Sequence, residues 1–156
     1  MKLAELVSRL HKAAPHVDAE YLRRQVRYWT ATGLVGEEEE LQDQPRRHRG
    51  YDTRHLYRAA LLVEFARYGM PRRIMQQVVE EISVRTRIYS DKHDSDPFED
   101  AINGTDVTLI FCLLHGRDGQ PFAQLRIGRT ETDEITLPFP ASWITISLIR
   151  VLAPLT

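Results

Sequence analysis

Apolar residues recur every three or four positions along the first half of the chain, a pattern that is typical of amphipathic helices. A first predicted helix carries Leu3, Leu6, Val7 and Leu10 on one face and stops before Pro15. A second is expected from an N-cap at Asp18 to about Thr32, and Gly33 lies where helices commonly end. The inward positions of this second helix are Leu22, Val26 and Trp29.

Two further helices are predicted after a polar segment. Residues 36–50 contain almost nothing that could enter a core, which favours a loop or a hairpin. A third helix follows Asp52 and ends at Gly69, and a fourth begins at Pro71 and carries apolar residues as far as Ile82. The remaining apolar positions of these two helices are Leu56, Ala59, Ala60, Val63, Phe65, Ile74, Met75, Val78 and Val79.

The pattern changes after residue 82. Residues 83–95 are polar, and the segment Asp96-Pro97-Phe98-Glu99 is typical of the start of a short helix, which Asn103-Gly104 closes. Three runs rich in β-branched and large apolar residues follow, at 107–114, 122–127 and 143–152, with the hairpin-turn signal Arg117-Asp118-Gly119 between the first two. We expect a small β-meander, although the last run also fits a helix.

The expected fold class is therefore α+β: an N-terminal four-helix domain over residues 1–82, a linker with a short helix over 83–104, and a small β-rich unit over 105–156. The composition, 42% hydrophobic and 28% charged, is that of a globular protein. No apolar run approaches the roughly 20 residues of a membrane span, and the first residues do not resemble a secretory signal. We expect a cytoplasmic protein with no membrane partner.

Charge gives a weak indication of the partner. The chain carries a net charge of −1, divided as 14 − 12 = +2 over residues 1–82 and 7 − 10 = −3 over residues 83–156. Four of the acids in the first part form the run Glu37–Glu40. This basic bias is modest and does not by itself predict nucleic-acid binding.

The sequence offers little support for catalysis or metal binding. Cys112 is the single cysteine and lies in an apolar run, which indicates a buried structural thiol. His115 has no nucleophile motif around it, and no glycine-rich phosphate loop is present. An acidic cluster lacks the spacing of a calcium loop, and we interpret it as a solvated linker and a helix cap. Its members are Asp91, His93, Asp94, Asp96, Glu99 and Asp100. We expect no catalytic residue, metal or cofactor.

Three segments of the first half resemble the MerR family of bacterial transcription regulators. Residues 25–35, QVRYWTATGLV, are similar to the family's recognition segment, with Arg27, Tyr28, Gly33 and Leu34 identical to its pattern. Residues 49–52, RGYD, resemble the end of its wing, and residues 61–71, LLVEFARYGMP, resemble the helix that precedes the last one of its DNA-binding domain. Three features differ from the family: the first turn lacks its Gly-Val-Ser sequence, the acidic run Glu37–Glu40 lies in the wing, where it would repel phosphate, and residues 83–105 show no heptad pattern.

The resemblance implies a winged helix-turn-helix domain that binds double-stranded DNA. The second helix would face the major groove and the basic end of the wing would face the backbone or the minor groove. The predicted DNA-binding residues are Arg23, Arg24, Arg27, Tyr28, Arg46, Arg47, His48, Arg49 and Tyr51. Trp29 is assigned to the core. As an alternative, Arg23 and Arg24 pair with Glu20 or face solvent without touching DNA.

The expected function is sequence-specific DNA binding in transcription regulation, by a nucleoid-associated homodimer. The alternative is a DNA-architectural, excisionase or phage-packaging factor that uses the same domain. We expect residues 105–156 to mediate self-association or another protein contact, because a three-stranded meander leaves an edge or a face that a partner can cover. The alternative is that this sheet packs on the winged domain of its own chain.

Overall fold

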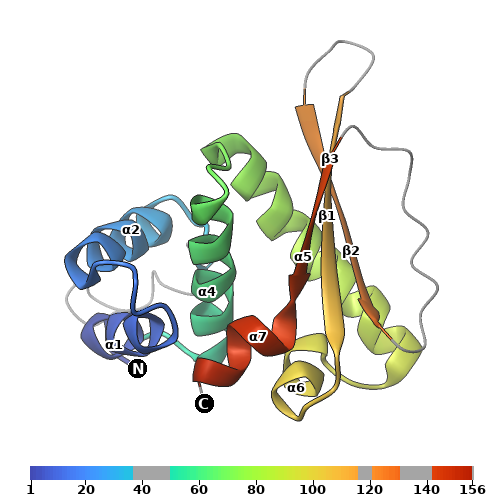
Figure 1. Cartoon of the computed structure of the whole chain (residues 1–156), viewed down its shortest axis with the longest axis horizontal. Helices are drawn as coiled ribbons and strands as arrows, with labels where there is room; N and C mark the ends of the chain where they lie inside the picture. The colour runs from blue at the N-terminus through green and yellow to red at the C-terminus, as the bar shows by residue number, and fades with distance from the viewer. Residues whose placement is uncertain (37–49, 116–120, 131–141, 156) are drawn as a thin grey trace. The chain divides into compact units, whose positions relative to one another are not determined.

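The structure is a computed structural model that describes residues 1–36, 50–115, 121–130 and 142–155 (Figure 1). It combines helices with a three-stranded antiparallel sheet, which confirms the predicted α+β class. The chain forms two compact units, Met1–Gly69 and Met70–Pro154, and each is described by itself below. The division at Gly69 lies earlier than the boundary at residue 82 that the sequence suggested, because the fourth predicted helix belongs to the second unit.

The described part of the first unit consists of α1 (Leu3–Ala13), α2 (Ala19–Ala31) and α4 (Thr53–Arg67). Helix α1 packs against both α2 and α4. The predicted inward positions of α2 are all buried, and Trp29, which the sequence assigned to the core, is 2% exposed. The other buried side chains of this core include Leu6, Val7, Leu10, Leu34, Leu56, Ala59, Leu62 and Phe65.

Local hydrogen bonds fix the two ends of α2. At its start, the carboxylate of Asp18 accepts a hydrogen bond from the backbone N–H of Tyr21 at 2.8 Å, which confirms the predicted N-cap. At its end, Gly33 has a φ of +74°, a conformation that glycine adopts without the clash of a side chain. The N–H of Leu34 then reaches the carbonyl of Trp29 at 2.8 Å, the Schellman arrangement that closes many helices.

The connection between α1 and α2 is a short turn built without glycine. His11 donates from Nδ1 to the carbonyl of Val17 at 2.9 Å, and the N–H of Val17 donates to the carbonyl of Ala14 at 3.0 Å. The side chain of His11 therefore ties the last turn of α1 to the residue before the N-cap of α2. These bonds hold the turn where the sequence lacks the Gly-Val-Ser of the MerR family.

Helix α4 begins with a capping box. Asp52 accepts from the backbone N–H of His55 at 2.9 Å, and the backbone N–H of Asp52 donates to Nδ1 of His55 at 3.2 Å. Burial tends to raise the pKa of the Asp52 carboxyl, but the hydrogen bond from the backbone N–H of His55 and the interaction with the His55 side chain outweigh burial and lower that pKa. The predicted start of the third helix after Asp52 and its end before Gly69 are both confirmed.

The second unit begins with α5 (Arg72–His93), which is longer than the sequence suggested. Residues 83–93 were expected to form a polar linker, and that expectation is wrong. The helix continues because Ile82 and Tyr89, seven residues apart, both face the interior of the unit and are buried. It ends at Asp94, whose φ is +53°, and the short helix α6 (Pro97–Ile102) follows.

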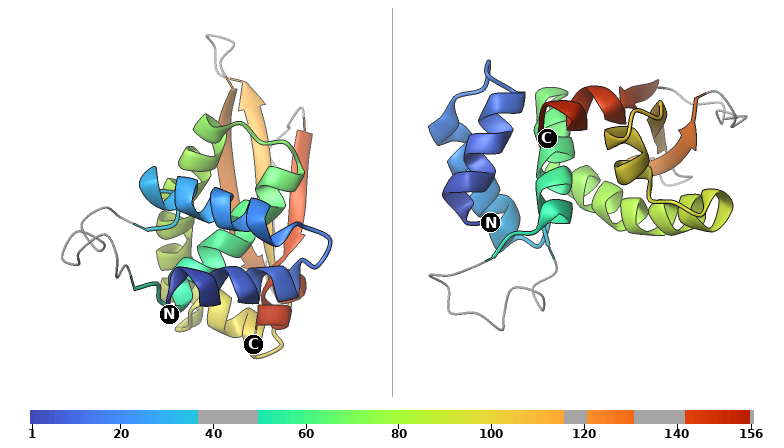
Figure 2. Two further views of the ribbon diagram at one scale, coloured as in Figure 1. Left: turned by 90° about the vertical axis from the view of Figure 1, so that its left-hand side faces the viewer. Right: turned by 90° about the horizontal axis from the view of Figure 1, so that it is seen from below.

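The sheet contains β1 (Val107–His115), β2 (Pro121–Arg129) and β3 (Ser142–Ser147), and Figure 2 shows the three strands from two further sides. Their order is β2-β1-β3, with both pairs antiparallel, so the predicted meander, which would have placed β2 in the centre, is wrong. The central position suits β1, because its residues 107–112 are buried on both faces of the sheet. The predicted hairpin of the first two strands is confirmed, while its turn residues 117–119 lie outside the described part of the chain.

The end of the chain combines both structures that the sequence left open. Residues 142–147 form β3 and pair with β1, and α7 (Leu148–Leu152) and a short 3₁₀ turn (Ala153–Leu155) follow directly. Helix α5 contacts β2, and α7 contacts α6 and β1. Cys112 in the middle of β1 is fully buried, and this burial raises the pKa of its thiol, which the positive charge of Arg126 lowers only in part. The predicted structural thiol is thus confirmed as a buried one.

Candidate nucleic-acid interface

Helix α2 presents a basic and aromatic surface opposite its buried face. Arg24 and Arg27 are exposed, and Tyr21 and Tyr28 are exposed by 41% and 45%. Positions 21, 24 and 28 follow one another at helical spacing, so the two tyrosines flank an arginine on one side of the helix. Long cationic side chains beside hydrogen-bonding aromatic rings are the groups that bind phosphates and base edges.

The arginines of α2 differ in their surroundings. Arg23 forms an ion pair with Glu20 at 2.7 Å, which is the structural alternative that the sequence had left open for it. Both side chains are largely exposed, so the pair contributes little to stability. Within the described residues, neither Arg24 nor Arg27 has an ion-pair partner. These two are also the arginines of α2 that are exposed, whereas Arg23 is partly buried.

Tyr51 is not placed for direct contact with DNA. Its side chain is 5% exposed, and its hydroxyl lies 3.1 Å from Oγ1 of Thr30. Thr30 in turn donates to the carbonyl of Val26 at 2.7 Å, inside α2. The ring of Tyr51 also meets the ring of His55 edge-on, with centroids 6.0 Å apart. Because its side chain is buried, the direct DNA contact predicted for Tyr51 is wrong. Tyr51 instead connects the segment before α4 to α2 through Thr30.

The sequence contained a signal for this internal role. Tyr51 precedes the N-cap Asp52, and Leu56 lies at the fourth position of the helix; apolar residues at these two positions commonly pack together. Both side chains are buried. The same signal does not identify Thr30, because nothing local distinguishes its hydroxyl from that of an exposed threonine.

The rest of the predicted interface lies outside the described residues. Arg46, Arg47, His48 and Arg49 belong to residues 37–49, as does the acidic run Glu37–Glu40. The DNA contacts expected of these residues stay predictions from the sequence. The described part of the interface is thus the exposed surface of α2, which we call the α2 surface: Tyr21, Arg23, Arg24, Arg27 and Tyr28.

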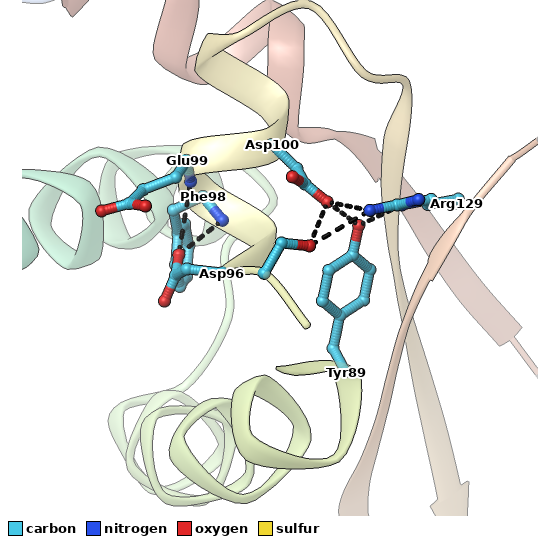
Figure 3. Close-up of polar contacts among 7 residues, drawn as sticks. Tyr89, Asp96, Phe98, Glu99, Asp100 and Arg129 are labelled. Atoms are coloured by element: carbon cyan, nitrogen blue, oxygen red, sulfur yellow. Dashed lines mark hydrogen bonds and ion pairs between the residues drawn. The ribbon is translucent and has the colours of Figure 1, made fainter. Parts of the chain in front are cut away.

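A second group of polar side chains lies in the other unit, where α5, α6 and β2 meet. We call Tyr89, Ser95, Asp100 and Arg129 the polar cluster (Figure 3). The oxygen Oδ2 of Asp100 accepts from the hydroxyl of Tyr89 at 2.6 Å, the hydroxyl of Ser95 at 2.8 Å and Nη2 of Arg129 at 2.7 Å. Arg129 also donates to the hydroxyls of Tyr89 and Ser95, at 3.0 and 3.1 Å.

The electrostatics of the polar cluster match its geometry. Burial tends to raise the pKa of Asp100, but the hydrogen bonds from Tyr89, Arg129 and Ser95 outweigh it and lower that pKa. Burial and the hydrogen bond to Asp100 raise the pKa of Tyr89 to about 12. The carboxylate therefore stays charged and the phenol stays protonated at neutral pH. Because the donors and acceptors satisfy one another, we interpret the polar cluster as a structural connection and not as a reactive site.

The sequence did not predict the polar cluster. It grouped Asp100 with acids of neighbouring sequence, whereas the structure joins it to residues 11 and 29 positions away. Asp96, from the same acidic group, caps α6 through the N–H groups of Phe98 and Glu99, as predicted and as Figure 3 shows. Among the described residues, no group of three or more His, Cys, Asp or Glu side chains is arranged to hold a metal ion.

Comparisons of the chain with protein-family models, curated proteins and solved structures gave no match. Within the described residues, the helices lack the combination of length and apolar content that crossing a membrane requires. The resemblance to the MerR family therefore depends on the sequence segments alone.

Proposed function

We propose that this protein binds double-stranded DNA in a sequence-specific manner and regulates transcription, as a MerR-like winged helix-turn-helix protein. The observation that carries the proposal is the two-sided character of α2. This helix buries Leu22, Val26 and Trp29 and exposes the α2 surface with Arg24, Arg27 and Tyr28. A recognition helix needs one side anchored in its own domain and cationic side chains free on the other.

The order of the elements supports the same function. Two helices joined by a short turn come first, and the next described helix, α4, follows residues 37–49, the position of the wing in the MerR-like sequence pattern. The hydrogen bond between Tyr51 and Thr30 fixes the chain after these residues against α2. In the proposed complex, Arg46, Arg47, His48 and Arg49 neutralise phosphates while α2 contacts bases. We further propose that the active form is a homodimer.

The test begins with selection of bound sequences from a random pool of duplex DNA by the full chain. The affinity for the selected sequence is then measured for Arg27→Ala and for Arg87→Ala, an exposed arginine of α5 that serves as the matched control. One lost contact between an arginine and a base weakens binding by about 1–3 kcal/mol, or roughly 5- to 150-fold. We expect this loss for Arg27→Ala and an affinity within about twofold of wild type for Arg87→Ala.

Three results would contradict the proposal. The selection yields no enriched sequence, Arg27→Ala binds as tightly as wild type, or both variants lose affinity equally. Because Arg27 is exposed and arginine and alanine both favour helices, neither substitution should change the melting temperature of the protein. A loss of affinity with a matching loss of folded protein would assign Arg27 to structure.

A further inference from the structure

Among the described residues, the two edge strands of the sheet in the second unit, β2 and β3, are protected to different degrees. Edge strand β2 begins with Pro121, which has no backbone N–H, and it carries the charged residues Arg126 and Arg129. The side chain of Gln77 on α5 also accepts a hydrogen bond from the backbone N–H of Ala123 at 3.1 Å. Edge strand β3, with the sequence SWITIS, contains neither proline nor a charged residue. Proline and charge are the usual means by which proteins prevent an edge strand from pairing further.

The same hydrogen bond shows which groups of β3 point outward. The backbone N–H of Ala123 donates to Gln77 on α5 and therefore does not donate to β1. Ala123 and its partner Leu113 thus form a non-hydrogen-bonded pair of the antiparallel ladder. The two pair types alternate along an antiparallel ladder, so the odd-numbered residues of β1 bond to β3 and the even-numbered ones to β2. In β3, residues 142, 144 and 146 therefore face β1 with their backbone groups. The backbone groups of residues 143, 145 and 147 point away from the sheet.

Two of these outward residues have no partner that the structure describes. Thr145 is exposed, and no described residue forms a hydrogen bond with it or with the backbone N–H of Ser147. The carbonyl of Ser147 is used differently, since Ser147 is the N-cap of α7 and its carbonyl accepts the first bond of that helix. By this alternation the outward edge carries the N–H and carbonyl of Thr145, the N–H of Ser147 and both backbone groups of residue 143.

We propose that β3 pairs antiparallel with β3 of a second copy of this chain, across a two-fold axis at Thr145. In this register Thr145 exchanges two hydrogen bonds with Thr145 of the second copy. The N–H of each Ser147 donates to the carbonyl of residue 143 across the axis. A strand centred on its own symmetry axis thus pairs both groups of Thr145 and the N–H of Ser147, and only the N–H of residue 143 faces a carbonyl that α7 already uses.

The side chains of β3 also fit the pairing of two copies of this strand. Ile144 of one copy lies beside Ile146 of the other on the face where Ile146 is buried, and the two threonines lie opposite each other on the second face. Apolar and β-branched cross-strand pairs stabilise a sheet, and the absence of charge in β3 leaves no repulsion across the axis. The two three-stranded sheets would join into one six-stranded sheet, which removes an open edge from each copy.

The proposal is tested with the full chain in the absence of DNA, so its outcome does not depend on the proposed function. Sedimentation velocity over a range of concentrations compares wild type with Thr145→Pro and Thr145→Val. Proline removes the outward N–H at the axis and leaves the bonds to β1 in place, whereas valine keeps the N–H and a β-branched side chain. We expect a dimer for wild type, a dissociation constant within about threefold for the valine variant, and one raised at least about tenfold for the proline variant.

A second measurement connects the dimer to this edge. Amide hydrogen exchange at Thr145 and Ser147 should slow as the wild-type concentration rises, because both N–H groups become bonded only in the dimer. If Thr145→Pro proves unfolded by circular dichroism, Thr145→Lys replaces it, since two lysines would then face each other across the axis. A wild-type chain that stays monomeric overturns the proposal, and so does a dimer in which the Thr145 amide exchanges as fast as in the monomer. A folded Thr145→Pro or Thr145→Lys variant that dimerises as strongly as wild type also overturns the proposal.

Discussion

Replacing Asp100 with asparagine isolates the charge at the centre of the polar cluster, because the two side chains have the same size and shape. Tyr89, Ser95 and Arg129 all donate to the same oxygen of Asp100, at 2.6, 2.8 and 2.7 Å. A hydrogen bond to a charged group stabilises a fold by about 1.5–3 kcal/mol, and one between neutral groups by about 0.5–1.5 kcal/mol. Each of the three bonds should therefore weaken by about 1 kcal/mol when the carboxylate becomes an amide. An amide costs less to desolvate, which offsets part of the loss. We expect the free energy of unfolding to fall by about 2–3 kcal/mol at pH 7.

The pH dependence of this difference has a defined sign. In the folded protein the pKa of Asp100 is lowered from its ordinary value of 3.8, so its charge stabilises the fold fully above that value. As the pH falls below 3.8, the carboxyl takes up a proton in the unfolded chain before it does so in the folded protein. The stabilisation therefore decreases with falling pH and is gone once the pH lies below the pKa of Asp100 in the folded protein. Asparagine does not titrate. The difference between wild type and Asp100→Asn should stay constant from pH 7 to pH 5 and shrink below the ordinary pKa.

Urea denaturation followed by circular dichroism measures both quantities. Because the chain forms two compact units, a urea transition can report on either of them, and hydrogen exchange of the β1 amides is used to follow the second unit. Asp91→Asn is the matched control, since Asp91 is an exposed acid on α5 outside the polar cluster, and its effect should stay within about 0.5 kcal/mol. Equal effects of the two substitutions, or a difference for Asp100→Asn that does not shrink in acid, would refute the reasoning.

Two further predictions concern the first unit. Tyr51→Phe removes the hydroxyl beside Thr30 but keeps the buried ring, and urea denaturation should show that the free energy of unfolding falls by about 0.5–1.5 kcal/mol. The exposed Tyr21→Phe should leave this free energy unchanged, and equal values for both variants would contradict the internal role of Tyr51. Replacing Arg46, Arg47 and Arg49 together by alanine should weaken binding to all DNA sequences alike and make the plot of log affinity against log salt shallower by about one unit per lost phosphate contact; an unchanged slope would place these arginines away from DNA.

The sequence predicted the helices of the first unit well because their ends are fixed by local interactions. Asp18 and Asp52 cap helices through backbone groups three residues away, and Gly33 and Gly69 adopt the positive φ that ends a helix. Such signals are complete within four or five residues of sequence. Binary patterning then separated the buried side of α2 from the exposed one, which is all that the described part of the candidate interface requires.

Contacts between distant segments were beyond the same reasoning. The continuation of α5 past Ile82 buries Tyr89, and its side chain bonds to Asp100 of α6 and Arg129 of β2, which lie far along the chain. Strand order failed for a related reason, because residues 130–141 between β2 and β3 are numerous enough to let β3 reach the far side of β1. The role of Tyr51 was misassigned because a tyrosine after a basic segment fits a DNA contact as well as a core position.

The charge of the chain limits how the proposed DNA complex can form. A net charge of −1, with only +2 over residues 1–82, provides little long-range attraction to a polyanion. The affinity must then come from direct contacts of a few residues, and Arg24 and Arg27 are the described arginines of α2 that have no ion-pair partner among the described residues. A single α2 surface therefore provides only a few contacts with DNA. Two copies joined at β3 would make the second binding event intramolecular, which raises affinity by a factor set by effective concentration without adding contacts. The proposed pairing of β3 and the proposed recognition by α2 are therefore independent in their tests and complementary in their energetics.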